Sequence, residues 1–190
     1  GGLNELLLTE AEKNANVKLH FEERCEEIFY HNGLMKTQTL NSEFRNHNYD
    51  VYFGTDGAFS AARTSLMKTE MLDFTYKHEW LAHGYKELHI PPTPEGGWQI
   101  EKECLHIWPR KSFMMIALPN LDGSFTCTLF LAHEGEISFE KLKTEDAVLE
   151  FYKSYFPDVI PLMPTLVHDF FANPESSLVT IKCNPWHYKD

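Results

Sequence analysis

The sequence predicts an α/β protein in two parts, a smaller part at residues 1–68 and a larger sheet with covering helices at residues 69–190. Three observations favour this fold class. A helical pattern precedes strand patterns near the amino terminus, longer strand patterns follow residue 69, and an apolar hairpin at residues 112–131 precedes two helical patterns. Because hairpins connect the later strands, we expect the second sheet to be mixed or antiparallel.

Composition limits the possible functions. Of 190 residues, 43% are hydrophobic, so the chain can bury a real core and is not disordered. The net charge of -11, without a lysine or arginine cluster, disfavours nucleic acid and anionic lipid as partners. No apolar run reaches the length of about 18 residues that a membrane span needs. Four dispersed cysteines without a Cys-x-x-Cys pair indicate reduced thiols, so we expect a cytoplasmic protein.

The smaller part begins with a helix. Leucines at positions 3, 6, 7 and 8 mark its apolar face, and residues 17–21 then alternate like a strand. Residues 25–30 and 34–40 indicate a hairpin, because the Asn-Gly pair between them favours a tight reversal. A polar bend is expected at residues 45–48.

The most informative stretch is a β-type run at residues 51–53 that ends in Gly-Thr-Asp-Gly and continues into a helix at residues 58–68. Gly54 and Gly57 free the backbone for close approach, and Ser60 can cap the helix. We expect a buried strand to hold the Asp56 carboxylate near helix amide groups, where a nucleotide cofactor could meet the protein. A plain β-turn before a capped helix explains the same residues.

The larger part begins with strand patterns at residues 79–90 and 98–107, separated by a loop rich in proline and glycine. Residues 112–118 and 125–131 form the apolar hairpin, and both of its faces are apolar, so both must be covered. One cover is expected to be helical.

The helical patterns come next. Thr144 begins a helix whose apolar stripe ends before Pro157. A shorter helix is expected at residues 165–172 and a last strand at residues 177–183.

Several segments closely resemble the kynurenine 3-monooxygenase family. They include Leu-His-Ile-Trp-Pro-Arg at 105–110, Phe-Met-Met-Ile-Ala-Leu-Pro-Asn at 113–120, Ser-Phe-Thr-Cys-Thr-Leu-Phe at 124–130 and Tyr-Phe-Pro-Asp-Val-Ile-Pro-Leu at 155–162. The likeness extends from Leu3 to about Tyr188. Residues 54–63 also resemble the Asp-Gly motif of the wider class of flavin-dependent aromatic hydroxylases.

The resemblance implies part of a Rossmann-like FAD-binding domain at residues 1–68, joined to a substrate-binding sheet domain at residues 69–190, as in the p-hydroxybenzoate hydroxylase fold. It implies a flavoprotein monooxygenase of tryptophan degradation and NAD biosynthesis. Such an enzyme uses NADPH to reduce FAD and hydroxylates L-kynurenine to 3-hydroxykynurenine. Both cofactors belong to the intact enzyme.

Matched residue by residue, the resemblance implies two sets of binding residues and no catalytic side chain. Asp56, Gly57 and Arg63 would serve the FAD and NADPH region, with Arg63 tying the loop down and the backbone of Cys25 near the adenine. The wall around the substrate ring would consist of Leu105, Met114, Ile116, Leu118, Thr128 and Phe130. Spacing supports a shared face, because the wall residues within each strand of the hairpin lie two positions apart.

Other interpretations of these residues remain. Ordinary core packing explains the hairpin without a ligand. The Trp-Pro-Arg run at 108–110 indicates either a cation-π or anion site, or a strand-end bend with a solvated arginine. The ten histidines, among them His20, His83 and His106, show no ligand pairing at helical or hairpin spacing, so we expect no metal site.

The family's pattern is incomplete in this sequence. Gly-x-Gly-x-x-Gly is absent, and the family's second flavin-contacting segment, a Gly-Asp followed by small residues, does not occur. We therefore expect an internal fragment that is inactive alone, does not retain FAD, and pairs with a second copy through unpaired sheet edges. Two other functions stay open, a flavin hydroxylase of another aromatic acid and a non-enzymatic module that binds an aromatic ligand.

Overall fold

The computed structural model describes residues 2–69 and 73–189, so Gly1, residues 70–72 and Asp190 of the two predicted parts lie outside the described residues. The chain divides into two compact units, one of Gly1–Lys77 with Ile181–Asp190 and one of His78–Thr180. The first unit has a three-stranded sheet of its own. The functional domains expected at 1–68 and 69–190 stay a prediction.

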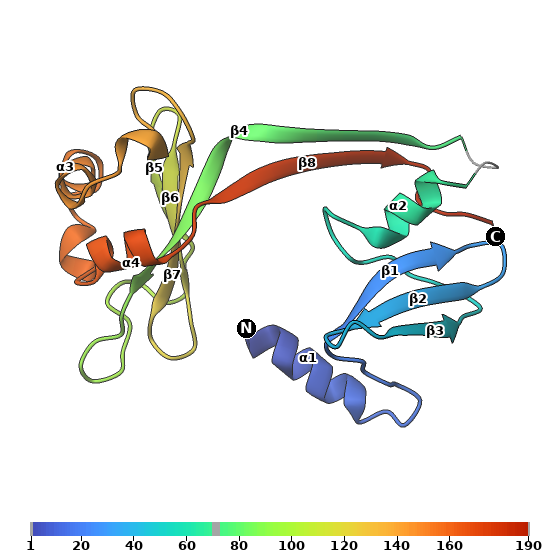
Figure 1. Ribbon diagram of the computed structural model, residues 1–190. Helices are drawn as coiled ribbons and strands as arrows, with labels where there is room; N and C mark the ends of the chain where they lie inside the picture. Colours follow the sequence, from blue (N-terminus) through green and yellow to red (C-terminus); the bar gives the residue numbers. More distant parts are fainter. Residues whose placement is uncertain (1, 70–72, 190) are drawn as a thin grey trace. The chain divides into compact units, whose positions relative to one another are not determined.

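The first unit contains helix α1 (Gly2–Glu12), helix α2 (Ala61–Met67) and an antiparallel sheet in the order β1-β2-β3 (Figure 1). Its strands are β1 (Glu23–Phe29), β2 (Leu34–Thr39) and β3 (Phe44–Asn48). The predicted β1–β2 hairpin is confirmed. Its turn depends on Gly33, whose φ of +65° is a conformation that side chains with a Cβ rarely adopt.

Three expectations for this unit are wrong. Residues 17–21 form no strand, and residues 45–48 belong to strand β3 instead of a bend. Residues 51–53 are not the predicted buried strand, because Val51 is 71% exposed and Phe53 is 82% exposed. The backbone N–H and C=O groups of a strand need hydrogen-bond partners on a neighbouring strand. Strand β3 has such a partner in β2, whereas no described strand pairs with residues 51–53.

Helix α2 packs on the β1–β2 hairpin through hydrogen bonds as well as apolar contact. The backbone N–H of Ile28 donates to Ser65 Oγ at 3.0 Å, and the Tyr30 hydroxyl donates to the carbonyl of Ala62 at 2.9 Å. Ala62 and Leu66 of α2 are buried. The helix that follows the Asp-Gly motif is therefore fixed against the sheet.

A nearly buried carboxylate connects the three strands. Glu23, with a side chain 4% exposed, accepts from Thr37 Oγ1 at 2.5 Å and contacts His47 Nε2 at 2.9 Å. His20 Nδ1 lies 3.3 Å away and Arg45 Nη1 lies 3.6 Å away. The hydrogen bonds from Thr37 and His47, helped by the charge of Arg45, lower the pKa of Glu23 to about 2.

This lowered pKa makes stability depend on acid. In the unfolded chain Glu23 titrates near 4.5, so its contribution is complete above that pH and is lost as pH falls from 4.5 towards about 2. We expect Glu23→Gln to have a lower free energy of unfolding at neutral pH. Between pH 4.5 and about 2 its free energy of unfolding should also fall less steeply with decreasing pH, because the difference of up to about one bound proton between the unfolded and folded states is removed. Urea unfolding at several pH values measures it. Glu22→Gln, at the neighbouring exposed position, is the control, and an equal change in both variants would contradict the role of Glu23.

The five-stranded sheet, which lies mainly in the larger unit, has the order β5-β6-β7-β4-β8, and its β5–β6, β6–β7 and β7–β4 pairs are antiparallel. Its strands are β4 (Thr75–Ile90), β5 (His106–Pro109), β6 (Met114–Pro119), β7 (Phe125–Ala132) and β8 (Ser176–Asn184). The predicted β6–β7 hairpin and the strands at 79–90 and 177–183 are confirmed. The strand expected at 98–107 is wrong over most of its length, because only its last two residues join a ladder.

Two helices cover one face of this sheet (Figure 1). They are α3 (Glu145–Tyr155), which the Thr144 side chain caps as predicted, and α4 (Leu166–Ala172). Two short 3-10 helices, η1 (Phe139–Lys141) and η2 (Ile160–Leu162), complete the covering layer. The helical cover predicted for the hairpin is confirmed.

The core lies between the sheet and these helices. Met115, Ala117, Cys127, Leu129 and Leu131 are fully buried and pack against α3 and α4. On the opposite face Met114 is 39% exposed and Leu118 is 47% exposed. The expectation that both faces are covered is wrong for the described residues, and an apolar face is left accessible.

Two further features bear on partners. None of the helices in the described part of the chain has the length and hydropathy that a transmembrane span requires.

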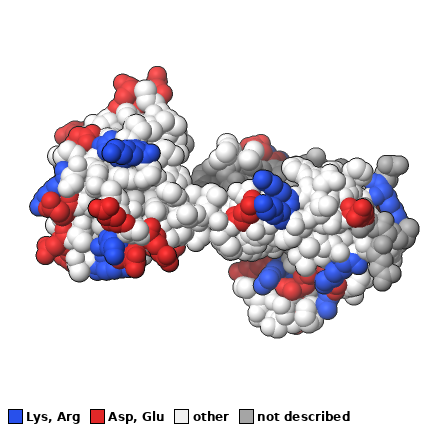
Figure 2. All heavy atoms as spheres, turned by 90° about the horizontal axis from the view of Figure 1, so that it is seen from above, with Lys and Arg blue, Asp and Glu red and all other residues white. Residues whose placement is uncertain are grey.

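On the face that Figure 2 shows, lysine and arginine side chains are separated and lie among acidic ones. That face therefore offers no extended basic surface.

Candidate functional site

The Asp-Gly motif of the first unit forms a closed loop at the start of α2. Asp56 Oδ2 accepts from the backbone N–H of Ala62 at 3.1 Å, and Ser60 Oγ accepts from that of Arg63 at 2.9 Å, so the predicted Ser60 cap is confirmed. The Arg63 guanidinium donates back to the carbonyls of Gly57, at 3.3 Å, and Ala58. These bonds hold the loop in one shape.

Both glycines of the motif are required by this shape. A Cβ on Gly54 would lie 2.9 Å from the Cβ of Ala62, so a larger residue would push α2 away from the loop. Gly57 has a φ of +75°, which side chains with a Cβ rarely adopt. The backbone between them is exposed. The loop therefore presents main-chain groups and one carboxylate to solvent.

Asp56 keeps its negative charge easily. Partial burial disfavours the charged form, but hydrogen bonds from the Ser60 hydroxyl and the Ala62 amide outweigh that effect and lower the pKa of Asp56. An exposed carboxylate fixed at a helix start can accept hydrogen bonds from the hydroxyls of a sugar or another polar ligand.

Tyr52, just before the Asp-Gly motif, connects this loop to Cys25 of strand β1. The Tyr52 hydroxyl donates to Cys25 Sγ at 3.8 Å, and the backbone of Cys25 sits at a β-bulge in the β1–β2 ladder. Burial raises the pKa of the Cys25 thiol, so the thiol stays neutral. The structure thus places Cys25 and the Asp-Gly loop in one unit, with Tyr52 between them.

In the larger unit, strand register brings five of the six predicted wall residues onto one face. Met114 lies opposite Phe130, and Ile116 lies opposite Thr128. Leu118 follows two residues after Ile116, so its side chain projects from the same face. We use the term outer face for the side of the sheet away from α3 and α4, and five of the predicted wall residues define it: Met114, Ile116, Leu118, Thr128 and Phe130. Leu105 is 52% exposed and precedes β5, outside the strands.

Sequence reasoning missed several residues of the outer face, among them Pro109 of β5, opposite Met114, and Glu87 of β4, opposite Thr128. Tyr85 of β4 lies opposite Phe130, with ring centroids 6.2 Å apart, and Ile107 of β5 lies opposite Ile116. Ile107 is 53% exposed. The period-2 alternation of residues 79–90 could have identified Tyr85, but placing it opposite Phe130 needed the strand order.

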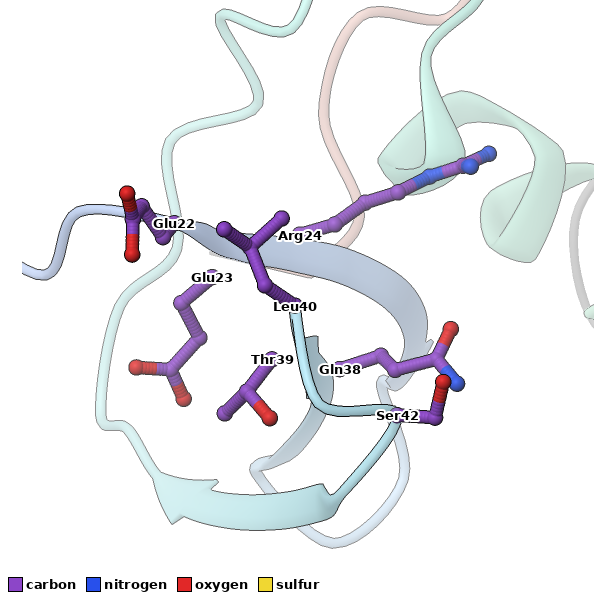
Figure 3. Close-up of a pocket in the computed structure, with 7 residues that line it drawn as sticks. All are labelled: Glu22, Glu23, Arg24, Gln38, Thr39, Leu40 and Ser42. Atoms are coloured by element: carbon purple, nitrogen blue, oxygen red, sulfur yellow. The ribbon is translucent and has the colours of Figure 1, made fainter.

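A hollow of about 420 Å³ lies at the open end of the β1–β2 hairpin (Figure 3). Its lining residues are Glu22, Glu23, Arg24, Gln38, Thr39, Leu40 and Ser42. In Figure 3 the Arg24 and Glu22 side chains extend away from each other, and the Glu23 carboxylate is already engaged by Thr37 and His47. The hollow lacks the convergent polar groups of a ligand site.

The described residues contain no cluster of three histidine, cysteine or acidic side chains placed to hold a metal ion. This part of the chain therefore offers two candidate surfaces, the Asp-Gly loop and the outer face.

Comparison with curated proteins finds close relatives. Over 187 residues, 98% of this chain, the sequence is 49% identical to a protein of Dictyostelium discoideum named kynurenine 3-monooxygenase. Proteins with the same name from Myxococcus xanthus and Flavobacterium psychrophilum are 45% and 44% identical. The chain spans 40% to 42% of the length of these relatives. No family model matches the sequence.

Solved structures share the fold at low sequence identity. The tetrameric form of 2-methyl-3-hydroxypyridine-5-carboxylic acid oxygenase matches 97% of this chain and 46% of its own chain, with a TM-score of 0.70 and 16% identity. The tetracycline destructase Tet(51) matches 92% of this chain and 44% of its own, with a TM-score of 0.52 and 15% identity. These likenesses confirm the predicted fold class.

Proposed function

We propose that this chain, which is homologous over nearly all of its length to a segment of the kynurenine 3-monooxygenase family, forms part of an FAD- and NADPH-dependent enzyme that hydroxylates L-kynurenine to 3-hydroxykynurenine. The observation that carries the proposal is the 49% identity to a protein of that name across 98% of the chain. In this proposal the larger unit supplies one wall of the substrate site, and the chain alone is inactive.

The outer face suits the ring of an aromatic substrate. The five predicted wall residues on this face are mostly apolar and none is buried: Met114, Ile116, Leu118, Thr128 and Phe130. We propose that Leu105, which is exposed just before β5, extends the same wall. Phe130 and Tyr85 present two rings to the same face. Apolar side chains there would bind the substrate ring, orient it and exclude water, while Thr128 supplies one hydroxyl.

The Asp-Gly loop fits a nucleotide cofactor. The loop has close backbone packing at Gly54 and a positive φ at Gly57, and it ends at the charged Asp56 carboxylate. We propose that Asp56 and Gly57 contact FAD, that Arg63 holds the loop, and that the backbone of Cys25 lies near the adenine. Bound flavin would supply the oxygen-activating chemistry.

The proposal also includes a cytoplasmic location and a homodimer. Strands β3 and β5 are sheet edges in the described residues, and unpaired edge backbone can pair with a second copy. A monomeric mass in light scattering of this chain would contradict the dimer.

Kynurenine-dependent NADPH oxidation, with the product identified, tests the function on the protein encoded by the complete gene and loaded with FAD. We expect 3-hydroxykynurenine. If flavin binds but kynurenine neither speeds oxidation nor is hydroxylated, the substrate is wrong. Hydroxylation of another aromatic acid would then indicate a different flavin hydroxylase. Failure to bind flavin would instead favour a non-enzymatic ligand-binding module.

Asp56→Ala tests the loop. We expect the complete protein to bind FAD, or to reduce it, at least about tenfold less well, because a charged hydrogen-bond acceptor is lost. Flavin content after gel filtration and the rate of NADPH-dependent bleaching measure this. Asp50→Ala, at an exposed position in the same unit, is the matched control. Normal flavin content and reduction in Asp56→Ala would refute the role.

A further inference from the structure

The tip of the β5–β6 hairpin is joined to the carboxyl end of α3 by an arginine. Arg110 Nε donates to the carbonyl oxygen of Tyr155 at 2.7 Å, Nη2 donates to the same oxygen, and the guanidinium lies 4.7 Å from the centroid of the Phe156 ring. Tyr155 ends α3, so its carbonyl has no partner within the helix and a cation there is favourable. The predicted alternative of a solvated arginine is therefore wrong.

Trp108 makes a second connection to the same region. Its Nε1 donates to Asp158 Oδ2 at 2.7 Å, and its ring stacks on His106 with centroids 5.9 Å apart. Trp108 lies opposite the fully buried Met115, so its side chain projects towards the helix-covered face. We refer to Trp108 and Arg110 as the clamp.

Phe113, at the other end of the same turn, completes the attachment. It is 7% exposed, and its ring lies 5.1 Å from that of Tyr155 and 5.7 Å from that of Phe151. The backbone N–H of Arg110 donates to the carbonyl of Phe113 at 2.8 Å, which closes the turn. The turn is thus packed on α3 by apolar rings and oriented by the clamp.

The intervening residues of β5 belong to the outer face. Ile107 and Pro109 lie opposite Ile116 and Met114, whereas the clamp residues alternate with them and project to the other side. Strand β5 has four residues and, among the described residues, pairs only with β6, because it lies at the edge of the sheet. A four-residue ladder on one side fixes the tilt of β5 weakly, so the clamp helps to determine where Ile107 lies, whereas Met114 is also held by its pairing with Phe130 of β7.

We propose that Trp108 and Arg110 are positioning residues, which set the shape of the outer face for its aromatic ligand from the opposite side of the sheet. The inference rests on the proposed function for the identity of that ligand. Neither side chain projects from the outer face, so their effect passes through the placement of β5 and the start of β6. A looser clamp widens the wall and weakens binding of the ring, without removing a group that takes part in the reaction.

Hydrogen exchange on this chain tests the clamp without a cofactor. We expect the amides of residues 106–108 to exchange at least about tenfold faster in Arg110→Ala, while those of β7 stay unchanged. Lys111→Ala removes the same charge from the adjacent position of the turn and should leave exchange as in the unsubstituted chain. Trp108→Phe keeps a ring but removes the donor to Asp158, and it serves if Arg110→Ala does not fold. Unchanged exchange in β5 in both variants would overturn the clamp.

Kinetics of the complete flavin-loaded protein tests the positioning role. For Arg110→Ala we expect KM for kynurenine to rise about tenfold with kcat within about twofold, since uniform binding is lost. Arg110→Lys keeps one donor for the Tyr155 carbonyl and should restore much of the affinity. An unchanged KM together with faster exchange in β5 would overturn the positioning role. If the unsubstituted protein does not hydroxylate kynurenine, the proposed function fails, while the exchange result still decides the clamp.

Discussion

Phe156→Ala is expected to destabilise the larger unit by about 3 to 5 kcal/mol, a large fraction of the roughly 5 to 15 kcal/mol by which domains are typically stable. Phe156 is fully buried, and its ring lies 5.5 Å from that of Tyr152, 5.8 Å from that of Phe151 and 6.1 Å from that of Phe113. Neighbouring rings held by α3 cannot collapse into the space, so the cavity persists. The Arg110 guanidinium would also lose the ring beneath it.

Urea unfolding followed by tryptophan fluorescence measures this loss, because Trp80, Trp98 and Trp108 belong to the larger unit. The matched control is Phe171→Ala on α4, since Phe171 is 47% exposed and its truncation should change stability by less than about 1 kcal/mol. If the two variants had similar midpoints, the cluster around Phe156 would not be the centre of the core.

The larger unit could be predicted well because its signals are local. The Asp-Gly turn at residues 122–123 and two flanking apolar runs define the β6–β7 hairpin, and Thr144 with the acidic residues after it defines the start of α3. Such features depend on neighbours in sequence, which are the same whatever the rest of the chain does.

Which side chains are buried depends on residues distant in sequence, so burial could not be predicted from local patterns. Lys86 lies in a strand that alternates as expected, yet it is 7% exposed, lies 4.8 Å over the Phe170 ring and donates to the Asn173 carbonyl at 2.8 Å. The leucines of α1 were predicted as an apolar face, and they are exposed in the described structure. Apolar pattern identifies a helix or strand, but only a packing partner decides which face is buried.

In the candidate site, too, the features set by local sequence could be predicted, and those set by contacts between distant residues could not. Alternation within the hairpin placed Met114, Ile116 and Leu118 on one face, and the register confirmed that Phe130 lies opposite Met114. The clamp was missed because Arg110 meets Tyr155 across 45 positions of sequence. A pattern within residues 105–110 carries no information on that contact.

Phe130→Ala is expected to weaken kynurenine binding to the complete protein by about 1 to 3 kcal/mol, or roughly fivefold to 150-fold in Kd. Phe130 projects from the outer face beside Tyr85, and its neighbours in sequence, Leu129 and Leu131, carry the core contacts on the other face. Truncation therefore removes apolar and stacking surface from the ligand while leaving the core of the unit in place. Titration of the flavin absorbance change with kynurenine gives the Kd.

A second variant in the same hairpin, Leu121→Ala, is the control that separates a binding role of Phe130 from a structural one. Leu121 in the β6–β7 turn is fully exposed, so Leu121→Ala should alter neither Kd nor stability. If Phe130→Ala lowered the urea midpoint as far as Phe156→Ala does, weaker binding would follow from unfolding and would say nothing about the wall. An unchanged Kd at an unchanged midpoint would remove Phe130 from the site, and with it the argument that the outer face receives the substrate ring.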